Sequence, residues 1–310
     1  DESFDCRGVY SGSALVHDGI VSLFYTGNVK LPCGDGSCDY IYSGREANTI
    51  LVNMAEDSSF GAKQLLMTNV DYPDDLSCHV RDPKVWCSDV PCGRYLMVQG
   101  ARRRVNAGNE CLQGYVSSRT ELLKRHNGAN CFSDQGEVLL FSSDNLVDWK
   151  LQNRITTPQQ FGFMWECPDY FELSDVRVLS VCPQGLVGSD WDRRNLYHSG
   201  YFTLDGDICS EYELGKFYVW DAGFDFYAPQ TFSSEDGRRI LIGWMSLPGD
   251  ESYGNDPTVA EGWQHCLTVP RELTVGADGV VLQQPAREIE HHYVSVRVGE
   301  GSLEVADDTC

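Results

Sequence analysis

The chain has 310 residues and carries 24 Lys and Arg against 46 Asp and Glu, for a formal net charge of −22. Its negative field repels phosphate backbones, which excludes nucleic acid as a partner. A neutral substrate such as a sugar suits that field, whereas a phosphorylated substrate would need a local basic pocket, and none can be located in the sequence.

Short β-branched or aromatic segments closed by turn residues predict strands throughout the chain. In chain order they are Ala14–Val16, Ile20–Tyr25, Arg94–Val98, Glu137–Phe141, Val176–Val181, Lys216–Trp220 and Arg239–Trp244. A turn or two of helix is expected only at Thr120–Arg125. Because the crossover helices of a parallel α/β fold are missing, the sequence predicts an all-β protein.

The strands group into repeating units, each of which begins with a polar motif and continues into an apolar strand pair. The motifs start at Ser11, Arg81, Glu166 and Tyr227. Intervals of roughly 60 to 90 residues suit the blades of a β-propeller with loop insertions, so four blades are visible. Since the innermost strand of every blade lines the central channel, these scattered motifs are expected to meet in one axial pocket.

A basic segment, residues 101–133, interrupts this rhythm. It contains six Lys or Arg residues, at Arg102, Arg103, Arg104, Arg119, Lys124 and Arg125. A solvated loop is one interpretation. An oligomer contact and a wall of the active-site mouth are the alternatives, since basic residues on an acidic protein can meet its own negative face.

The cysteine spacing argues against a metal-binding protein, and the hydropathy argues against a membrane-spanning one. The 13 cysteines include two Cys-x4-Cys pairs, Cys33/Cys38 and Cys87/Cys92, without a second pair at zinc-ribbon spacing, so neither a structural metal nor a cofactor is expected. The odd count and the lack of an Asn-x-Ser/Thr sequon favour reduced cysteines and a cytoplasmic protein, with secretion as the alternative. No apolar run approaches the ~18 residues that span a membrane.

Glu166 has the surroundings of a catalytic acid. Glycoside hydrolysis needs a carboxylic acid that protonates the leaving oxygen and a second carboxylate at the anomeric carbon. The segment Phe163-Met164-Trp165-Glu166-Cys167-Pro168-Asp169 places three large apolar side chains before the glutamate. Their desolvation is expected to raise the pKa of Glu166 and keep the acid protonated.

Trp165-Glu166-Cys167-Pro168-Asp169, together with Arg81-Asp82-Pro83-Lys84-Val85-Trp86, resembles glycoside hydrolase family 32, the invertases, fructosidases, inulinases and levanases. Further matches follow in family order over about residues 5 to 290. They are Tyr10–Ala14, Phe24–Gly27, Ser143–Trp149 as a strand-ending turn, Asp225–Gln230, Ile242–Met245 and Pro270–Leu273. The resemblance implies a five-bladed β-propeller followed by a β-sandwich.

Carried over position by position, the resemblance implies roles for eight residues. Glu166 is the general acid/base, and Asp82 is the transition-state stabiliser that grips fructosyl hydroxyls. Asp82 is expected to stay ionised with help from the adjacent Arg81, and Cys167 to pack beside Glu166 and help set its pKa. The remaining predicted sugar contacts are Tyr10, Ser11, Tyr227 and Trp244, where Tyr10 replaces the Phe more usual in the family.

The family's nucleophile, the Asp of an Asn-Asp-Pro-Asn-Gly-like motif in the first blade, is not present in this sequence. Asn255-Asp256-Pro257 is followed by Thr258 and is interpreted as turn chemistry. The retaining mechanism is therefore implied by the resemblance alone. We expect the 310-residue chain by itself to release no fructose, and its open blade edge to favour association into a homo-oligomer.

Two domains are expected: a catalytic propeller over residues 1–273, and a connector with the start of a β-sandwich over residues 274–310, with strands at Tyr293–Val298 and Ser302–Val305. The sequence predicts a β-fructofuranosidase acting on sucrose or short fructo-oligosaccharides. A fructosyltransferase with the same residues is one alternative. An inactive carbohydrate-binding pseudo-enzyme is the other.

Overall fold

The computed structural model describes residues 2–32, 38–105, 134–186, 197–223, 225–246 and 257–292. These residues form four antiparallel sheets of four strands each, and every sheet takes its strands in chain order. The expected helix at Thr120–Arg125 and the expected strands at 293–298 and 302–305 lie outside the described residues. No described helix is long and apolar enough to cross a membrane.

The first two sheets follow one another along the chain. The first contains β1 (Val9–His17), β2 (Ile20–Lys30), β3 (Arg45–Met54) and β4 (Gln64–Met67), followed by the short helix η1 (Asn69–Asp71). The second contains β5 (Leu76–Cys87), β6 (Tyr95–Arg103), β7 (Gln135–Ser143) and β8 (Lys150–Ile155).

The other two sheets complete the arrangement. The third contains β9 (Met164–Leu173), β10 (Val176–Gln184), β11 (Gly200–Gly206) and β12 (Tyr212–Val219). The fourth contains β13 (Tyr227–Ser233), β14 (Arg239–Trp244), β15 (Arg271–Val275) and β16 (Val281–Pro285), with the short helices η3 (Pro257–Glu261) and η4 (Arg287–His292) beside it.

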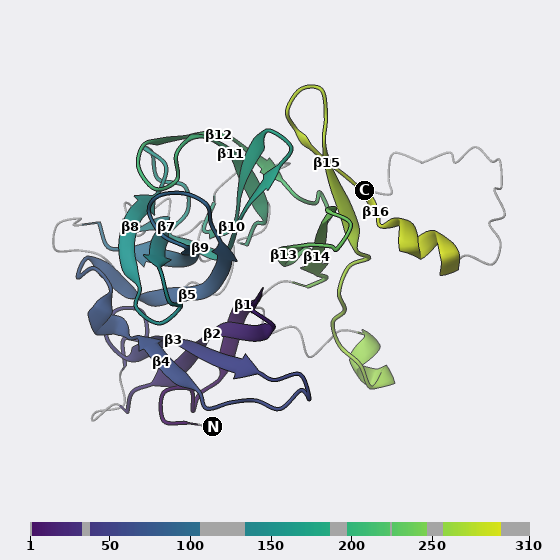
Figure 1. Ribbon diagram of the computed structural model, residues 1–310. Helices are drawn as coiled ribbons and strands as arrows, with labels where there is room; N and C mark the ends of the chain where they lie inside the picture. Colours follow the sequence, from purple (N-terminus) through teal and green to yellow (C-terminus); the bar gives the residue numbers. More distant parts are fainter. Residues whose placement is uncertain are drawn as a thin grey trace, which may run out of the picture.

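The four sheets are arranged around a common centre as propeller blades (Figure 1). Their first strands, β1, β5, β9 and β13, carry the four predicted motifs and are the innermost strands. The predicted all-β propeller and its four visible blades are confirmed. A β-sandwich after residue 273 stays a prediction. The predicted domain boundary at 273 falls inside the β15–β16 hairpin, so the fourth strand of this sheet lies in the segment that was assigned to the connector.

Strand alternation builds the cores between blades. Along β6, Tyr95 and Met97 join the cluster shared with the first blade, while Leu96 and Val98 join the cluster shared with the third. All four side chains are at most 1% exposed. Because successive residues point to opposite faces, a strand buried on both faces needs an unbroken apolar run, which Tyr95–Val98 supplies.

Trp165 packs between the second blade and the third. Its ring is fully buried, and its indole nitrogen donates to the Phe161 carbonyl at 2.6 Å. A Cβ at Gly136 would lie 2.3 Å from the Trp165 ring, and one at Gly100 would lie 2.0 Å from the Trp165 carbonyl oxygen. The two glycines are therefore required by the close approach of β9.

The segment from Ser143 to Trp149 is a turn between β7 and β8, as predicted. The Asn145 side chain accepts hydrogen bonds from the backbone amides of Val147 and Asp148 at 3.0 and 2.8 Å. Trp149 donates to the Leu146 carbonyl and packs edge-on against Phe24 of the first blade. The turn residues thus also contribute to packing between the blades.

One disulfide was not anticipated. Cys92, before β6, is bonded to Cys209, before β12, 117 residues later in the chain. This bond differs from the expectation of reduced cysteines. Sequence spacing could not reveal it, because only the neighbouring positions of the second and third blades bring the two residues together.

Candidate active site

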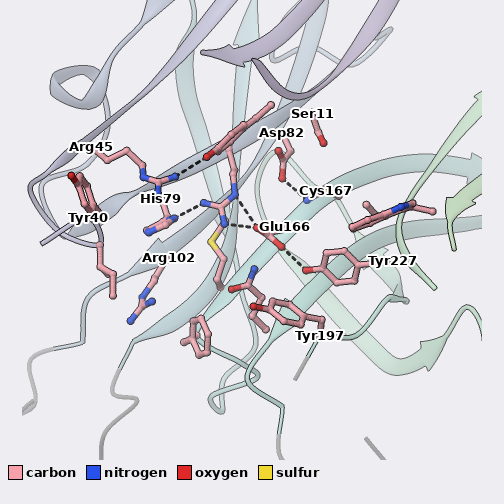
Figure 2. Close-up of a pocket in the computed structure, with 18 of the residues that line it drawn as sticks. Ser11, Tyr40, Arg45, His79, Asp82, Arg102, Glu166, Cys167, Tyr197 and Tyr227 are labelled. Carbon is pink, nitrogen blue, oxygen red and sulfur yellow. Dashed lines mark hydrogen bonds and ion pairs between the residues drawn. The ribbon is translucent and has the colours of Figure 1, made fainter. Parts of the chain in front are cut away.

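The innermost strands enclose a cavity of about 670 Å³ at the centre of the molecule (Figure 2). This volume is that of a typical small-molecule site. All eight predicted site residues line it, namely Tyr10, Ser11, Arg81, Asp82, Glu166, Cys167, Tyr227 and Trp244. The expected convergence of the four motifs on one axial pocket is therefore what the structure contains.

Three related tetrapeptides explain how neighbouring residues can face the same cavity. We call Arg81–Lys84, Glu166–Asp169 and Tyr227–Gln230 the three proline motifs, since each has proline third. The residue before the proline has a positive φ in each: 63° at Asp82, 47° at Cys167 and 49° at Ala228. The strand pairing shifts at each of these places. This bulge breaks the alternation of the strand, so the first and second residues both line the cavity.

Glu166 is bound on both carboxylate oxygens. Its Oε1 accepts a hydrogen bond from Arg81 Nε at 3.0 Å and another from Arg81 Nη2. Its Oε2 accepts the Tyr227 hydroxyl at 2.5 Å. Side chains of the second and fourth blades thus hold a carboxylate of the third blade in the cavity.

The pKa of Glu166 is the reverse of the expectation. Burial acts to raise the pKa, but the charge of Arg81 and the hydrogen bonds from Tyr227 and Arg81 outweigh burial and lower it below the ordinary value. The prediction of a raised pKa was wrong because it rested on the residues that precede Glu166 in sequence and left out its ion-pair partner.

Asp82 is held by backbone contacts from two blades. Its amide donates to Thr26 Oγ1 of β2 at 3.0 Å, and its Oδ2 accepts the Cys167 amide at 2.9 Å. Burial raises the pKa of Asp82 to about 6, against the lowering effect of the Arg81 charge. Asp82 is thus ionised at neutral pH, as expected, but it gains a proton at a much higher pH than an ordinary aspartate.

The other predicted contacts surround these two carboxylates. Cys167 is buried with Cys182, Tyr197 and Tyr227, and a hydrogen bond with Cys182 together with burial raises the pKa of its thiol well above the ordinary value. Its influence on the pKa of Glu166 stays a prediction. Trp244 of β14 pairs with Tyr227 in the sheet and lines the same side of the cavity.

The cavity wall also contains a group of basic and aromatic residues that were not among the eight predicted site residues. They are Arg45 of β3, His79 of β5, Arg102 of β6 and Tyr40. His79 lies two positions before Arg81, so strand alternation could have placed it on the same face. Arg102 belongs to the basic segment for which an active-site wall was one interpretation. Residues 106–133 of that segment lie outside the described residues.

Asp82 and Glu166 are the acidic residues in the described cavity lining. Asn255 and Asp256, which were interpreted as a turn, lie outside the described residues. In the described ranges, no group of three or more His, Cys, Asp or Glu side chains is placed to hold a metal ion.

Comparison with known proteins places this site in a family. The model of the glycosyl hydrolases family 32 N-terminal domain matches residues 1–121 and 126–285. The chain is 38% identical over 293 residues to a sucrose-6-phosphate hydrolase of Bacillus subtilis, covering 93% of this chain and 52% of the relative. It is 35% identical over 291 residues to a raffinose invertase of Escherichia coli, covering 93% of this chain and 52% of that protein.

Solved structures give the same result. A sucrose-6-phosphate hydrolase from Lactobacillus gasseri superposes with a TM-score of 0.72 at 26% identity, over 94% of this chain and 51% of that one. A family 32 beta-fructofuranosidase of Bombyx mori superposes with a TM-score of 0.67 at 25% identity, over 94% of this chain and 53% of that one. The chain thus spans about half the length of the proteins it matches.

Proposed function

The chain belongs to glycoside hydrolase family 32, and we propose that the protein hydrolyses β-fructofuranosidic bonds, with Glu166 as general acid/base and Asp82 as the residue that holds the fructosyl group. The observation that carries this proposal is the cavity itself. It contains both the buried Asp82 carboxylate and the partly buried Glu166 carboxylate, and Arg81 and Tyr227 contact Glu166 there.

Glu166 is proposed to protonate the oxygen that leaves the anomeric carbon. This role requires a proton on a group whose pKa the Arg81 charge lowers. When Arg81 exchanges its hydrogen bonds with Glu166 for bonds to sugar hydroxyls, burial becomes the dominant influence and raises the pKa of Glu166. Substrate binding would then prepare the acid at the moment when it is needed.

Asp82 is proposed to accept hydrogen bonds from two vicinal hydroxyls of the fructosyl ring. These bonds strengthen as positive charge develops at the anomeric carbon, which stabilises the transition state more than the bound substrate. The backbone bonds of Asp82 to Thr26 and Cys167 fix its position before substrate arrives. Such preorganisation means that little rearrangement is needed during the reaction.

The proposed reaction is retaining, as the family resemblance implies. A carboxylate attacks the anomeric carbon, the bond to the leaving oxygen breaks, and the Glu166 proton goes to that oxygen. Water then attacks the fructosyl-enzyme while Glu166 takes up the water proton. The attacking carboxylate is proposed to be the Asp of the family's Asn-Asp-Pro-Asn-Gly-like motif, so neither Asp82 nor Glu166 serves as nucleophile.

Sucrose and sucrose 6-phosphate are the proposed substrates. The relatives that support this choice bear the names sucrose-6-phosphate hydrolase and raffinose invertase. Short fructo-oligosaccharides remain further candidates. Fructosyl transfer to a second sugar would use the same residues, since only the acceptor differs from water.

The test is product analysis with the protein expressed from its natural reading frame. It is incubated with sucrose, kestose, inulin and levan, and free fructose and longer oligosaccharides are quantified. Free fructose as the main product supports hydrolysis, whereas accumulation of longer oligosaccharides would assign transfer instead. Binding of sugar without turnover of any substrate would refute the enzyme and support a carbohydrate-binding protein.

A further inference from the structure

One side of the cavity is basic although the chain is strongly acidic. Arg45 begins β3, His79 lies in β5, and Arg102 lies near the end of β6. We call these three residues the basic corner. In Figure 2 they lie together beside Tyr40, on the opposite side of Glu166 from Tyr227. No single stretch of sequence contains the corner, which is why a basic pocket could not be located before folding was known.

Arg45 has unused hydrogen-bonding capacity. Its Nη1 donates to the Tyr10 hydroxyl at 3.1 Å, but its Nε is buried and has no hydrogen-bond partner among the described residues. The structure also gives it no ion pair with a described carboxylate. Because Nε is covered, a ligand in the cavity would meet the terminal nitrogens of this guanidinium, whose charge no described carboxylate balances.

The other charges of the cavity wall are already engaged. Arg81 is paired with Glu166, and the Arg102 Nε donates to Asp134 Oδ2 at 2.6 Å. Arg102 also lies over the Phe163 ring, 4.7 Å from its centroid, which fixes the plane of its guanidinium. Among the described arginines of the cavity wall, Arg45 is therefore the one without an ion pair, and Arg102 is a rigid second donor.

The pKa of His79 is affected by the positive charges of this corner. Burial and the charges of Arg81, Arg45 and Arg102 hold the pKa of His79 well below its ordinary value. The neutral imidazole accepts a hydrogen bond from Arg81 Nη1 at 2.6 Å through Nδ1. The field of three arginines thus acts on one side chain, and the neutral His79 accepts a hydrogen bond from Arg81 without adding a charge.

The corner lies where the leaving-group sugar is expected. A general acid protonates the oxygen between the two sugars, so the sugars lie on either side of Glu166. Asp82 holds the fructosyl ring on one side, and Figure 2 shows Arg45, His79 and Arg102 on another side, away from Asp82. A substituent on the leaving sugar would therefore meet the basic corner.

We infer that the basic corner binds a phosphate ester on the leaving-group sugar, with Arg45 and Arg102 as the specificity-determining residues. This inference rests on the proposed function for the orientation of the substrate. A phosphate monoester carries a charge of about −1.5 to −2 at pH 7 and three acceptor oxygens. Arginine is the side chain best suited to it, because its planar fork donates two parallel hydrogen bonds.

The first experiment measures the ratio of kcat/KM for sucrose 6-phosphate to kcat/KM for sucrose. Arg45→Gln is expected to lower this ratio by about 10- to 100-fold, the effect of one charge-assisted hydrogen bond. Arg45→Lys keeps the charge and should retain most of the ratio. Arg177→Gln, an exposed arginine of β10 that is paired with Glu172 away from this cavity, is the matched control and should leave the ratio unchanged.

The second experiment measures binding by calorimetry and does not need turnover. Glucose 6-phosphate, the product released with the phosphate, should bind more tightly than glucose or inorganic phosphate, and Arg45→Gln and Arg102→Gln should each remove that advantage. Equal affinity for glucose and glucose 6-phosphate would overturn the inference. Inorganic phosphate that binds as tightly as glucose 6-phosphate would also overturn it, because the corner would then recognise a free anion.

The two measurements separate this inference from the proposed function. A wild-type protein that cleaves sucrose but shows no phosphate preference in either measurement would refute the basic corner alone. A phosphate preference in binding without cleavage of either fructoside would refute the proposed hydrolase and leave the corner as the recognition site for a sugar phosphate.

Discussion

The first and last residues of the three proline motifs lie only three positions apart, yet their environments differ sharply. The first residues, Arg81, Glu166 and Tyr227, meet in the cavity. The last residues, Lys84, Asp169 and Gln230, meet beyond it and join three blades, since Lys84 Nζ donates to Asp169 Oδ2 at 3.3 Å and to Gln230 Oε1 at 3.4 Å.

The difference lies in the partners that hold the carboxylate in each region. Asp169 is fully buried, and its Oδ2 also accepts the amide and hydroxyl of Thr231, both at 2.7 Å. In the cavity, Asp82 is strained at φ 63° and has a pKa raised to about 6. The repeated motifs thus place stabilising interactions on one side and, on the other, the reactive Asp82 carboxylate at a stability cost.

Asp82→Asn should give the largest effect, in opposite directions for activity and stability. Turnover of sucrose should fall by about 1000-fold, since the neutral amide stabilises the developing positive charge poorly. Folding raises the pKa of Asp82 from 3.8 to about 6, so the carboxylate's contribution favours folding below pH 4 and is lost as the pH rises through 6. The free energy of unfolding of the variant should therefore exceed that of the wild-type protein by about 2–3 kcal/mol at pH 7.5, and the two should be equal at pH 4.

Urea unfolding at both pH values measures this effect, with the exposed Asp175→Asn as control. A loss of stability at pH 7.5 in Asp82→Asn would show that the cavity carboxylate stabilises the fold, and the contrast between the two ends of the motifs would then be wrong.

Lys84→Met should destabilise the protein by about 3 kcal/mol, because it leaves the buried Asp169 carboxylate without its cation. The kcat of the folded protein should stay close to normal, since Lys84 lies outside the catalytic cavity. Thermal unfolding and initial rates measure the two effects. Lys150→Met, at the exposed start of β8, is the matched control. If Lys84→Met lost turnover but not stability, the last residues of the motifs would have a catalytic role.

Arg81→Gln should shift the pH dependence of the reaction. The Arg81 charge lowers the pKa of Glu166, so its removal raises that pKa and keeps the acid protonated to higher pH. The alkaline limb of kcat/KM should therefore move to higher pH. Arg81→Lys retains the charge and should keep the limb near its wild-type position. An unchanged limb in Arg81→Gln would mean that another group sets it.

Ala228→Gly should give the smallest effect. Ala228 has a φ of 49°, a conformation that costs a residue with a Cβ about 1 kcal/mol and costs glycine little. The variant should gain about 0.5 kcal/mol after the greater flexibility of unfolded glycine is subtracted. Ala14→Gly, at an exposed strand position of β1, should lose stability instead. Equal losses in both variants would show that the bulge is not strained.

The repeated motifs made much of the fold and the site predictable. A proline motif in each of three blades marks an innermost strand, and every residue placed in the site by resemblance lines the cavity. The basic corner could not be found in this way. Arg45 and Arg102 lie on β3 and β6, which are not innermost strands and carry no motif, so only the packing of the blades brings them to the cavity.

The electrostatics of the site also escaped prediction for a physical reason. Arg81 is adjacent to Asp82 in sequence and was expected to support it, but the bulge at Asp82 directs the Arg81 guanidinium towards Glu166 of the next blade. The pKa of each carboxylate follows its neighbours in space. The residues taken from the sequence line one cavity, but the predicted direction of the Glu166 pKa shift was wrong.

The central claim is that Glu166 donates the proton to the leaving oxygen. It is tested most directly by comparing Glu166→Gln with the wild-type protein, both from the natural reading frame, on sucrose and on β-fructofuranosyl fluoride, whose leaving group needs no proton. The rate of sucrose cleavage should fall by about 100- to 10,000-fold, whereas formation of the fructosyl-enzyme from the fluoride should fall far less. An equal loss on both substrates, or near-normal cleavage of sucrose, would contradict the account.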